Sequence, residues 1–208
     1  FEEKLSLFTA LLEGGPVTWS GMTRPPLDAA RVYPPVESGR LRTWVGVGGS
    51  ATSVTRAARY RLPLMIAIIG GQADRFLPLV ELYRGTLEQD GVAPLPIGVH
   101  SPGHIAETDA EAVEQFWPGY LANVTRIGAE RGWPPPSRLR FEGEVANGAL
   151  YVGSPETVAR RIAATVSTVG IDRFDLKYAS GPMPHSTLMR SVELYGTRVI
   201  PLVRDMLA

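Results

Sequence analysis

Glycines and small hydroxyl residues cluster where an expected strand gives way to a helix, in the stretch Trp44-Val-Gly-Val-Gly-Gly-Ser-Ala-Thr-Ser53. Gly48 and Gly49 carry no Cβ that would obstruct a close ligand, and Ser50 can cap the helix that follows. The first amide N–H groups of a helix have no intrahelical partner and lie at the positive end of its dipole. We therefore expect an anionic group such as a phosphate to bind the turn formed by Gly48, Gly49, Ser50, Ala51, Thr52 and Ser53.

Other interpretations of this turn compete with the phosphate site. An ordinary strand-to-helix turn with a serine cap explains the same residues. The segment Gly46-Val-Gly-Gly-Ser-Ala51 also fits the loose dinucleotide-binding template, but the next expected strand ends Ala67-Ile-Ile-Gly-Gly-Gln72, without the carboxylate that would hold a ribose. A P-loop is excluded because no Gly-Lys-Ser/Thr follows the glycines.

The three histidines are the other candidates for chemistry. His100 and His104 are four residues apart, but Pro102-Gly103 lies between them and interrupts any helix, so we expect no metal site there. We expect residues 101–104 to form a loop at the end of a strand, where substrate contacts occur in parallel α/β enzymes. His185 precedes the last expected helix. His100, His104 and His185 are therefore candidate substrate-pocket residues.

Two further polar groups have structural explanations. Ser154, followed by Pro155 and Glu156, fits a helix cap, although a second phosphate loop has the same pattern. Asp175 and Lys177 share one face of an expected strand because alternate residues point the same way. We expect them to form a buried ion pair inside the sheet.

Composition excludes several classes of partner and site. The 208 residues are 44% hydrophobic and 20% charged, which is typical of a globular protein. Lys plus Arg and Asp plus Glu number 21 each, so no net field favours nucleic acid or a membrane surface. There is no cysteine, and the longest apolar run, residues 62–69, is too short to cross a bilayer. We expect a cytoplasmic protein that acts on a small molecule.

The order of expected elements places these residues. An amphipathic helix begins at Phe1 with no capping residue and no initiator methionine before it, which indicates a piece of a longer protein. Residues 22–40 and 138–150 have no regular pattern, and residues 133–148 are a candidate lid. The expected strands are 41–47, 63–69, 95–100 and 173–178, and helices are expected at 51–59, 74–89, 108–131, from 155 onward, and at 186–206.

Strands that alternate with helices of crossover length predict a parallel α/β fold. The continuous apolar run at 63–69 predicts a strand buried on both faces. Because eight such strands close into a barrel without edges, we expect the C-terminal half of a (β/α)8 barrel. Residues 1–208 would then be a single-domain fragment with strands five to eight. A complete four-stranded domain and a half-barrel that dimerises are the alternatives.

Several motifs, taken in order, resemble the bacterial-luciferase-like flavin monooxygenase family. The resemblance covers almost the whole chain. It implies a (β/α)8 barrel that binds FMN, or the deazaflavin F420 in one branch, at the C-terminal ends of the strands. The motifs are Phe1-Glu-Glu-Lys-Leu5, Gly14-Gly-Pro-Val-Thr-Trp-Ser-Gly21, Trp44-Val-Gly-Val-Gly-Gly-Ser50, Glu107-Thr-Asp-Ala-Glu-Ala112, Val152-Gly-Ser-Pro-Glu-Thr-Val158 and Leu188-Met-Arg-Ser-Val-Glu-Leu-Tyr-Gly-Thr197.

The resemblance also implies a site and a reaction. The family's flavin phosphate sits at the turn after the fifth strand, which corresponds to Gly49–Ser53 here, with the hydroxyls of Ser50 and Ser53 as donors. Luciferase has an acidic residue in this turn, whereas this chain has Gly49. The implied activity is oxidation of a small organic substrate by reduced FMN and oxygen.

Partners and alternatives follow from the same resemblance. A separate flavin reductase would supply the reduced FMN, and the full-length protein would be a homodimer. The alternatives are hydride transfer with F420 and a non-catalytic flavin-binding relative. The family's catalytic side chains lie mainly on early strands, so no catalytic residue is named here.

Overall fold

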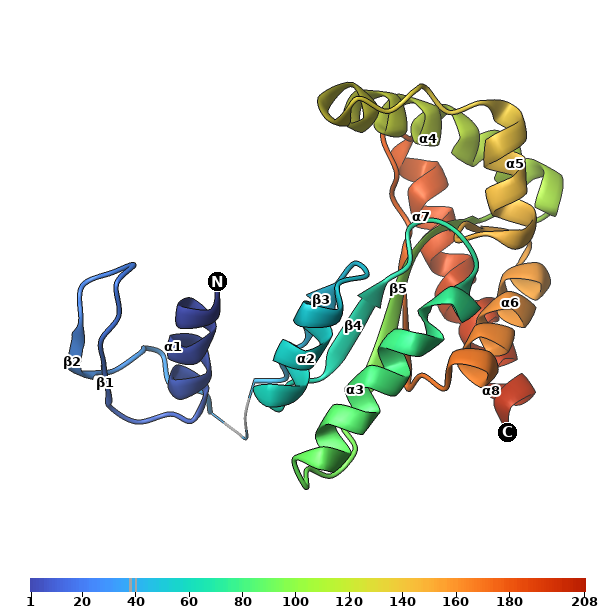
Figure 1. The fold of residues 1–208 in the computed structure, drawn as a ribbon. Coiled ribbons are helices and arrows are strands. Elements are labelled where there is room, and N and C mark those ends of the chain that lie inside the picture. Colours follow the sequence, from blue (N-terminus) through green and yellow to red (C-terminus); the bar gives the residue numbers. More distant parts are fainter. Residues whose placement is uncertain (38, 40) are drawn as a thin grey trace.

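The N-terminal helix and a short hairpin lie to one side of the main body of the molecule (Figure 1). The computed structural model describes residues 1–37, 39 and 41–208. Helix α1 (Glu2–Leu12) contacts α2 (Ala51–Arg59) through an ion pair of 2.7 Å between Glu2 and Arg56. The bounds of α1 confirm the helix that was expected to begin at the start of the sequence.

The hairpin corrects one expectation. Strand β1 (Val17–Trp19) pairs antiparallel with β2 (Leu27–Ala30), and β2 lies inside residues 22–40, which were expected to be irregular. The sequence of β2, Leu-Asp-Ala-Ala, has low strand propensity and alternates weakly, so pairing with β1 rather than local pattern defines it. The expectations for Ser38 and Arg40 lie outside the described residues.

The main body alternates parallel strands with helices. A π-helical turn, Tyr195–Val199, joins the last two helices into one continuous segment where a single helix was expected. The remaining elements are β3 (Val45–Val47), β4 (Leu64–Ala67), the 3-10 turn Ala73–Phe76, α3 (Leu77–Gln89), β5 (Ile97–Ile105), α4 (Asp109–Arg131), α5 (Arg138–Asn147), β6 (Tyr151–Gly153), α6 (Pro155–Val169), β7 (Arg173–Lys177), α7 (His185–Leu194) and α8 (Ile200–Leu207).

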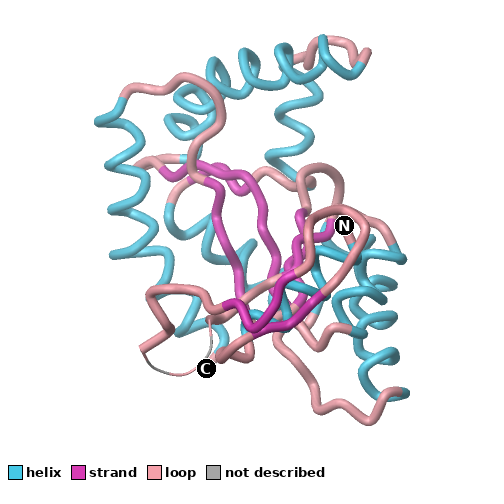
Figure 2. Tube along the Cα trace, turned by 90° about the vertical axis from the view of Figure 1, so that its left-hand side faces the viewer, coloured by secondary structure: helices cyan, strands magenta, loops and turns pink. Residues whose placement is uncertain are grey.

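The strands follow one another across the sheet in the order β3-β4-β5-β7, all parallel. Figure 2 shows these strands side by side, with helices outside them. Each strand of this order pairs with the one before it, and the short β6 pairs with the far end of β5. An open doubly wound sheet, in contrast, reverses its order part-way. This is the order of a (β/α)8 barrel, so the expected α/β partial barrel is confirmed.

One face of the sheet is buried and the other is not. Val47, Leu64, Ile66 and Val99 are at most 2% exposed and belong to one core cluster with the covering helices. Met65, on the opposite face, is only partly buried. The prediction that residues 63–69 are buried on both faces is therefore wrong, because this inner face of the sheet has no covering layer among the described residues.

Strand β5 is longer than expected. Residues 101–104 were expected to form a loop, but they continue the strand to Ile105. The Pro102-Gly103 pair marks where the neighbour changes, since β7 pairs with β5 up to Pro102 and β6 pairs with it from Gly103 onward. A Cβ on Gly103 would lie 2.3 Å from the carbonyl oxygen of Tyr151, so only glycine allows this approach.

Helix α5 corrects the expectation that residues 138–150 are irregular. The Ser137 hydroxyl caps it by accepting the Arg140 N–H at 3.2 Å. Its one fully buried residue, Phe141, packs with ring centroids 5.0 Å from both Trp117 and Tyr120 of α4. Tertiary packing of one aromatic side chain, rather than a repeating apolar pattern, holds this helix against α4.

Candidate functional site

The turn between β3 and α2 is open to solvent. Gly48, Gly49, Ser50, Ala51 and Thr52 are exposed, and Ser53 is partly buried. The Ser50 hydroxyl caps α2 by accepting the Ser53 N–H at 3.4 Å, which leaves the N–H groups of Ala51 and Thr52 without an intrahelical partner. The first turn of α2 contains no acidic residue. Free amides at an uncompensated helix N-terminus suit an anion.

The two glycines provide room for that anion. A Cβ built on Gly48 or Gly49 would meet no atom within 4 Å, so the space above the turn is unfilled by protein. Gly49 has φ +126°, a conformation that side-chain-bearing residues rarely adopt. The turn therefore has the shape and donors that a phosphate requires, and its anion-binding role stays a prediction.

The turn before α6 differs from the turn before α2 because an acidic side chain of the protein binds at it. Ser154 caps α6, as expected, and its own N–H donates to the Asp109 carboxylate at 2.7 Å. The Thr157 hydroxyl donates to the other Asp109 oxygen at 3.0 Å. Burial raises the pKa of Asp109, but these hydrogen bonds and the charge of Arg160 outweigh it and leave the pKa lowered. The Asp109 carboxylate is thus the anionic group at the N-terminus of α6.

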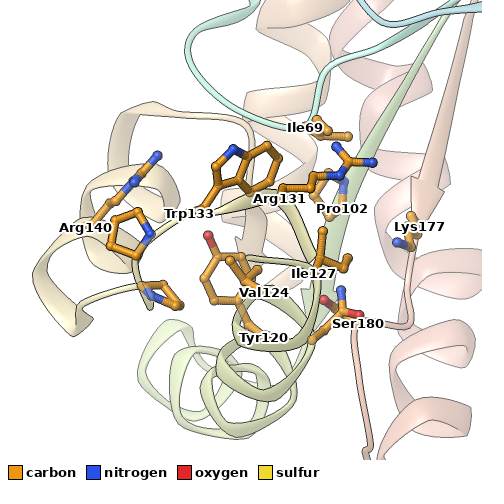
Figure 3. Close-up of a pocket in the computed structure, with 13 residues that line it drawn as sticks. Ile69, Pro102, Tyr120, Val124, Ile127, Arg131, Trp133, Arg140, Lys177 and Ser180 are labelled. Atoms are coloured by element: carbon orange, nitrogen blue, oxygen red, sulfur yellow. The ribbon is translucent and has the colours of Figure 1, made fainter. Parts of the chain in front are cut away.

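A cavity of about 410 Å³ lies at the C-terminal ends of three strands. Ile69 follows β4, Pro102 lies in β5 and Lys177 ends β7, while α4, α5 and the loop between them form the opposite wall (Figure 3). Enzymes built on parallel barrels place their active sites at this end of the strands. The other lining residues are Tyr120, Asn123, Val124, Ile127, Arg131, Trp133, Pro134, Pro136, Arg140 and Ser180.

None of the three histidines lines this cavity. His100 is partly buried on β5, in register with Ala67 on one side and Asp175 on the other. His185 is exposed at the start of α7. Their contact with a substrate stays a prediction.

His104 is fully buried. Its Nε2 lies 2.8 Å from Oε1 of Gln115, and its ring stacks on Phe116 with centroids 5.9 Å apart. Because an amide oxygen only accepts, Nε2 carries the proton, and Nδ1 is left as a buried acceptor with no hydrogen-bond partner among the residues that the structure describes. Burial lowers the pKa of His104, more than the Gln115 contact and the charge of Glu111 raise it, so the ring is neutral near pH 7.

The expected ion pair of Asp175 with Lys177 is wrong. Asp175 pairs instead with Arg173, two residues earlier on the same face, at 2.7 Å. The two side chains are 36% and 53% exposed, so this pair is not buried either. Arg173 and Asp175 are alternate residues of β7, so their side chains share a face and can pair, and the Arg173 guanidinium also lies 5.5 Å from the centre of the Trp44 ring.

Sequence reasoning missed the residues of α4 and α5 that line the cavity. Arg131 ends α4, its guanidinium lies 5.1 Å from the centre of the Trp133 ring, and Arg140 lies in the helix that had no visible pattern. The only local signal was a tryptophan among prolines at residues 133–136. No group of His, Asp or Glu within residues 1–37, 39 and 41–208 is arranged to hold a metal ion. Over the same residues, no helix combines the length and apolar character needed to cross a membrane.

Comparison with known proteins decides the family. The family model for luciferase-like monooxygenases matches residues 1–173. The chain belongs to the luciferase-like monooxygenase family. No curated protein sequence matches the chain.

Solved structures of luciferase-like proteins share this fold. The monooxygenase RslO1 of Streptomyces bottropensis has a TM-score of 0.77 at 21% identity, over 97% of this chain and 60% of its own. The oxygenating constituent of 3,6-diketocamphane monooxygenase of Pseudomonas putida, in complex with FMN, gives 0.58 at 19% identity, over 76% and 47%. The coenzyme F420-dependent tetrahydromethanopterin reductase of Methanopyrus kandleri gives 0.63 at 14%, over 96% and 63%. The chain therefore spans less than two thirds of each of these structures.

Proposed function

We propose that this chain forms strands five to eight of a flavin-dependent oxidoreductase that uses reduced FMN and molecular oxygen to oxidise a small organic substrate. The observation that carries the proposal is the open turn Gly48–Ser53, whose exposed amides and unfilled space lie at the end of β3. Family membership supports it, because the relatives with this fold include an oxygenating protein in complex with FMN.

The turn would hold the cofactor by its phosphate. The N–H groups of Ala51 and Thr52 would donate to phosphate oxygens, and the Ser50 hydroxyl hydrogen is free to donate while its oxygen caps the helix. Reduced FMN, when bound, supplies the electrons with which oxygen oxidises the substrate. The absence of an acidic residue in the first turn of α2 favours the phosphate over a neutral ligand.

The cavity beneath α4 would receive the substrate. It opens at the same end of the sheet as the turn, because all the strands are parallel and both features follow strand C-termini. Ile127, Val124 and Trp133 provide an apolar wall that excludes water from the reacting groups. A lid role for residues 133–148 remains part of this proposal.

F420-dependent hydride transfer is the alternative, because a structure of the same fold belongs to an F420-dependent reductase. F420 also carries a phosphate, so the turn accommodates either cofactor. The FMN proposal includes a separate flavin reductase and assembly as a homodimer. A non-catalytic flavin-binding relative, in contrast, would bind the cofactor without turnover.

Titration of the protein with FMN, riboflavin and F420 tests the proposal. We expect FMN to bind at least tenfold more tightly than riboflavin, because only FMN has the phosphate that the turn would hold; this ratio corresponds to about 1.4 kcal/mol. Equal affinity for the two flavins would contradict the phosphate assignment. F420 is recognised by its single absorbance band. Tighter binding of F420 than of FMN would favour the F420-dependent alternative. Oxygen consumption with reduced FMN then separates an enzyme from a binding relative.

A further inference from the structure

We propose that the cavity at the ends of β4, β5 and β7 selects an organic anion, a molecule with an apolar ring or chain and one acidic group such as a carboxylate or sulfonate. This inference rests on the proposed function for the assignment of the cavity to the substrate. It adds the chemical class of that substrate, which neither the turn nor the family determines.

The charge of the cavity wall carries the inference. Arg131, Arg140 and Lys177 line the cavity, and no carboxylate does so within the described part of the chain. Figure 3 shows Arg140 and Lys177 at opposite sides, with Arg131 and Trp133 between them. Cations around an apolar space raise the local concentration of anions and favour their binding.

These cations form no ion pair with a carboxylate of the described residues, whereas several other arginines do. Ion pairs of the protein join Arg138 to Glu114 and Glu142, Arg190 to Glu107 and Glu193, and Arg198 to Glu107 and Glu156. No such pair within the described residues involves the three cationic side chains of the cavity wall, and the Arg131 guanidinium lies over the ring of Trp133. A chain with equal numbers of acidic and basic residues thus leaves three positive charges uncompensated around one space.

Two acidic residues on the elements around the cavity have other partners. Asp175 precedes Lys177 by two residues on the same strand face, but it pairs with Arg173 at 2.7 Å. Glu144, whose charge acts on Tyr120, accepts the N–H of Gly71 at 3.1 Å and of Ala149 at 3.0 Å. Among the described residues, neither carboxylate forms an ion pair with Arg131, Arg140 or Lys177.

The remaining lining suits the uncharged part of such a molecule. Ile69, Val124, Ile127 and Trp133 supply apolar surface, and the Tyr120 hydroxyl supplies a polar group. About 410 Å³ is within the range of small-molecule sites. The cavity therefore has both apolar surface and cationic side chains, so it suits a molecule with an apolar part and one negative charge.

The cofactor's phosphate does not account for these charges. Lys177 ends β7, and the proposed phosphate turn follows β3, three strand spacings away in the order β3-β4-β5-β7. At about 4.8 Å per spacing, the two lie roughly 14 Å apart along the sheet. One phosphate cannot contact both Lys177 and this turn, so a phosphate held at the turn leaves Lys177 available to a second anionic group.

The test compares two probes that share a fused aromatic ring and an aniline and differ in one charge. 8-Anilinonaphthalene-1-sulfonate carries a sulfonate, and N-phenyl-1-naphthylamine does not. Both fluoresce on entering an apolar site, so direct titration of the protein without cofactor gives both affinities. We expect the sulfonate to bind at least tenfold more tightly. Equal affinity, or no binding of the sulfonate, would overturn the proposal.

Substitutions locate the binding. Arg131→Met and Lys177→Met should each weaken sulfonate binding about three- to tenfold and leave the neutral probe within twofold. Arg204→Met, at an exposed arginine of α8 that no ion pair involves, is the matched control and should change neither affinity. Sulfonate binding that persists in the Arg131→Met, Lys177→Met double variant would overturn the proposal. Ser50→Asp should leave sulfonate binding unchanged while it affects FMN, so failure of this inference and failure of the flavin assignment give different results.

Discussion

The Asp109 carboxylate accepts the Ser154 N–H at 2.7 Å and so occupies the N-terminus of α6. The turn at Ser50 also follows a parallel strand and also begins a helix with a serine cap, but no acidic side chain lies in the first turn of α2. Both turns lie at the same edge of the sheet. The protein therefore compensates one helix N-terminus with its own aspartate and leaves the other available for an external anion.

Replacing this aspartate should destabilise the protein, and the effect should depend on pH. Asp109→Ala removes the acceptor for Ser154 and Thr157, and we expect a loss of about 1 kcal/mol in the free energy of unfolding at pH 7. The pKa of Asp109 is lowered by folding, so its contribution is present above the ordinary value of 3.8 and is lost as pH falls through the lower folded value. Urea unfolding at pH 7 measures the loss. Asp205→Ala, at an exposed position of α8, should cost less than about 0.5 kcal/mol.

Two glycines of β5 should differ in their tolerance of a methyl group. Gly103→Ala would place Cβ 2.3 Å from a backbone oxygen of Tyr151, and we expect a loss of about 2 to 3 kcal/mol because the backbone of β6 must move. Gly98→Ala would place Cβ 2.6 Å from the terminal methyl of Met65, a flexible side chain that can turn aside at a cost of about 1 kcal/mol. Thermal unfolding of both variants checks the order. Equal losses would show that β6 does not approach β5 as described.

Stability should fall in mild acid because of His104. Its pKa is lowered from 6.5 by burial, so the unfolded state takes up a proton at this position before the folded state does. The contribution of neutral His104 is therefore complete above about pH 6.5 and is lost as pH falls toward the folded value. His104→Gln, which does not titrate, should show a smaller drop in melting temperature between pH 7.5 and pH 5.5 than the wild type. An unchanged drop would indicate that His104 is protonated in the folded protein.

Local patterns predicted most elements but not the cavity. The predicted caps Ser50 and Ser154 gave correct helix starts, because capping depends on residues within one turn. The Pro102-Gly103 pair was misread as a strand end, since a change of neighbouring strand is a tertiary event with no local signature.

The cavity could not be predicted from the sequence, because its lining residues come together only in the folded protein. Its three cations come from α4, α5 and β7, which are separated by long stretches of sequence and meet only through packing. The phosphate turn could be predicted because all its donors are consecutive residues. The roles of His100 and His104 could not be predicted, because they depend on which face of β5 each side chain occupies.

The central claim is that the turn after β3 binds the cofactor's phosphate, and titration of FMN against Ser50→Asp tests it most directly. Aspartate caps helices as well as serine does, so the variant should fold with unchanged melting temperature. Ser137→Asp, the same change at the cap of α5, is the matched control. We expect Ser50→Asp to abolish FMN binding by placing a negative charge against the phosphate, while Ser137→Asp binds like the wild type. Wild-type affinity for FMN in the Ser50→Asp protein would contradict the account.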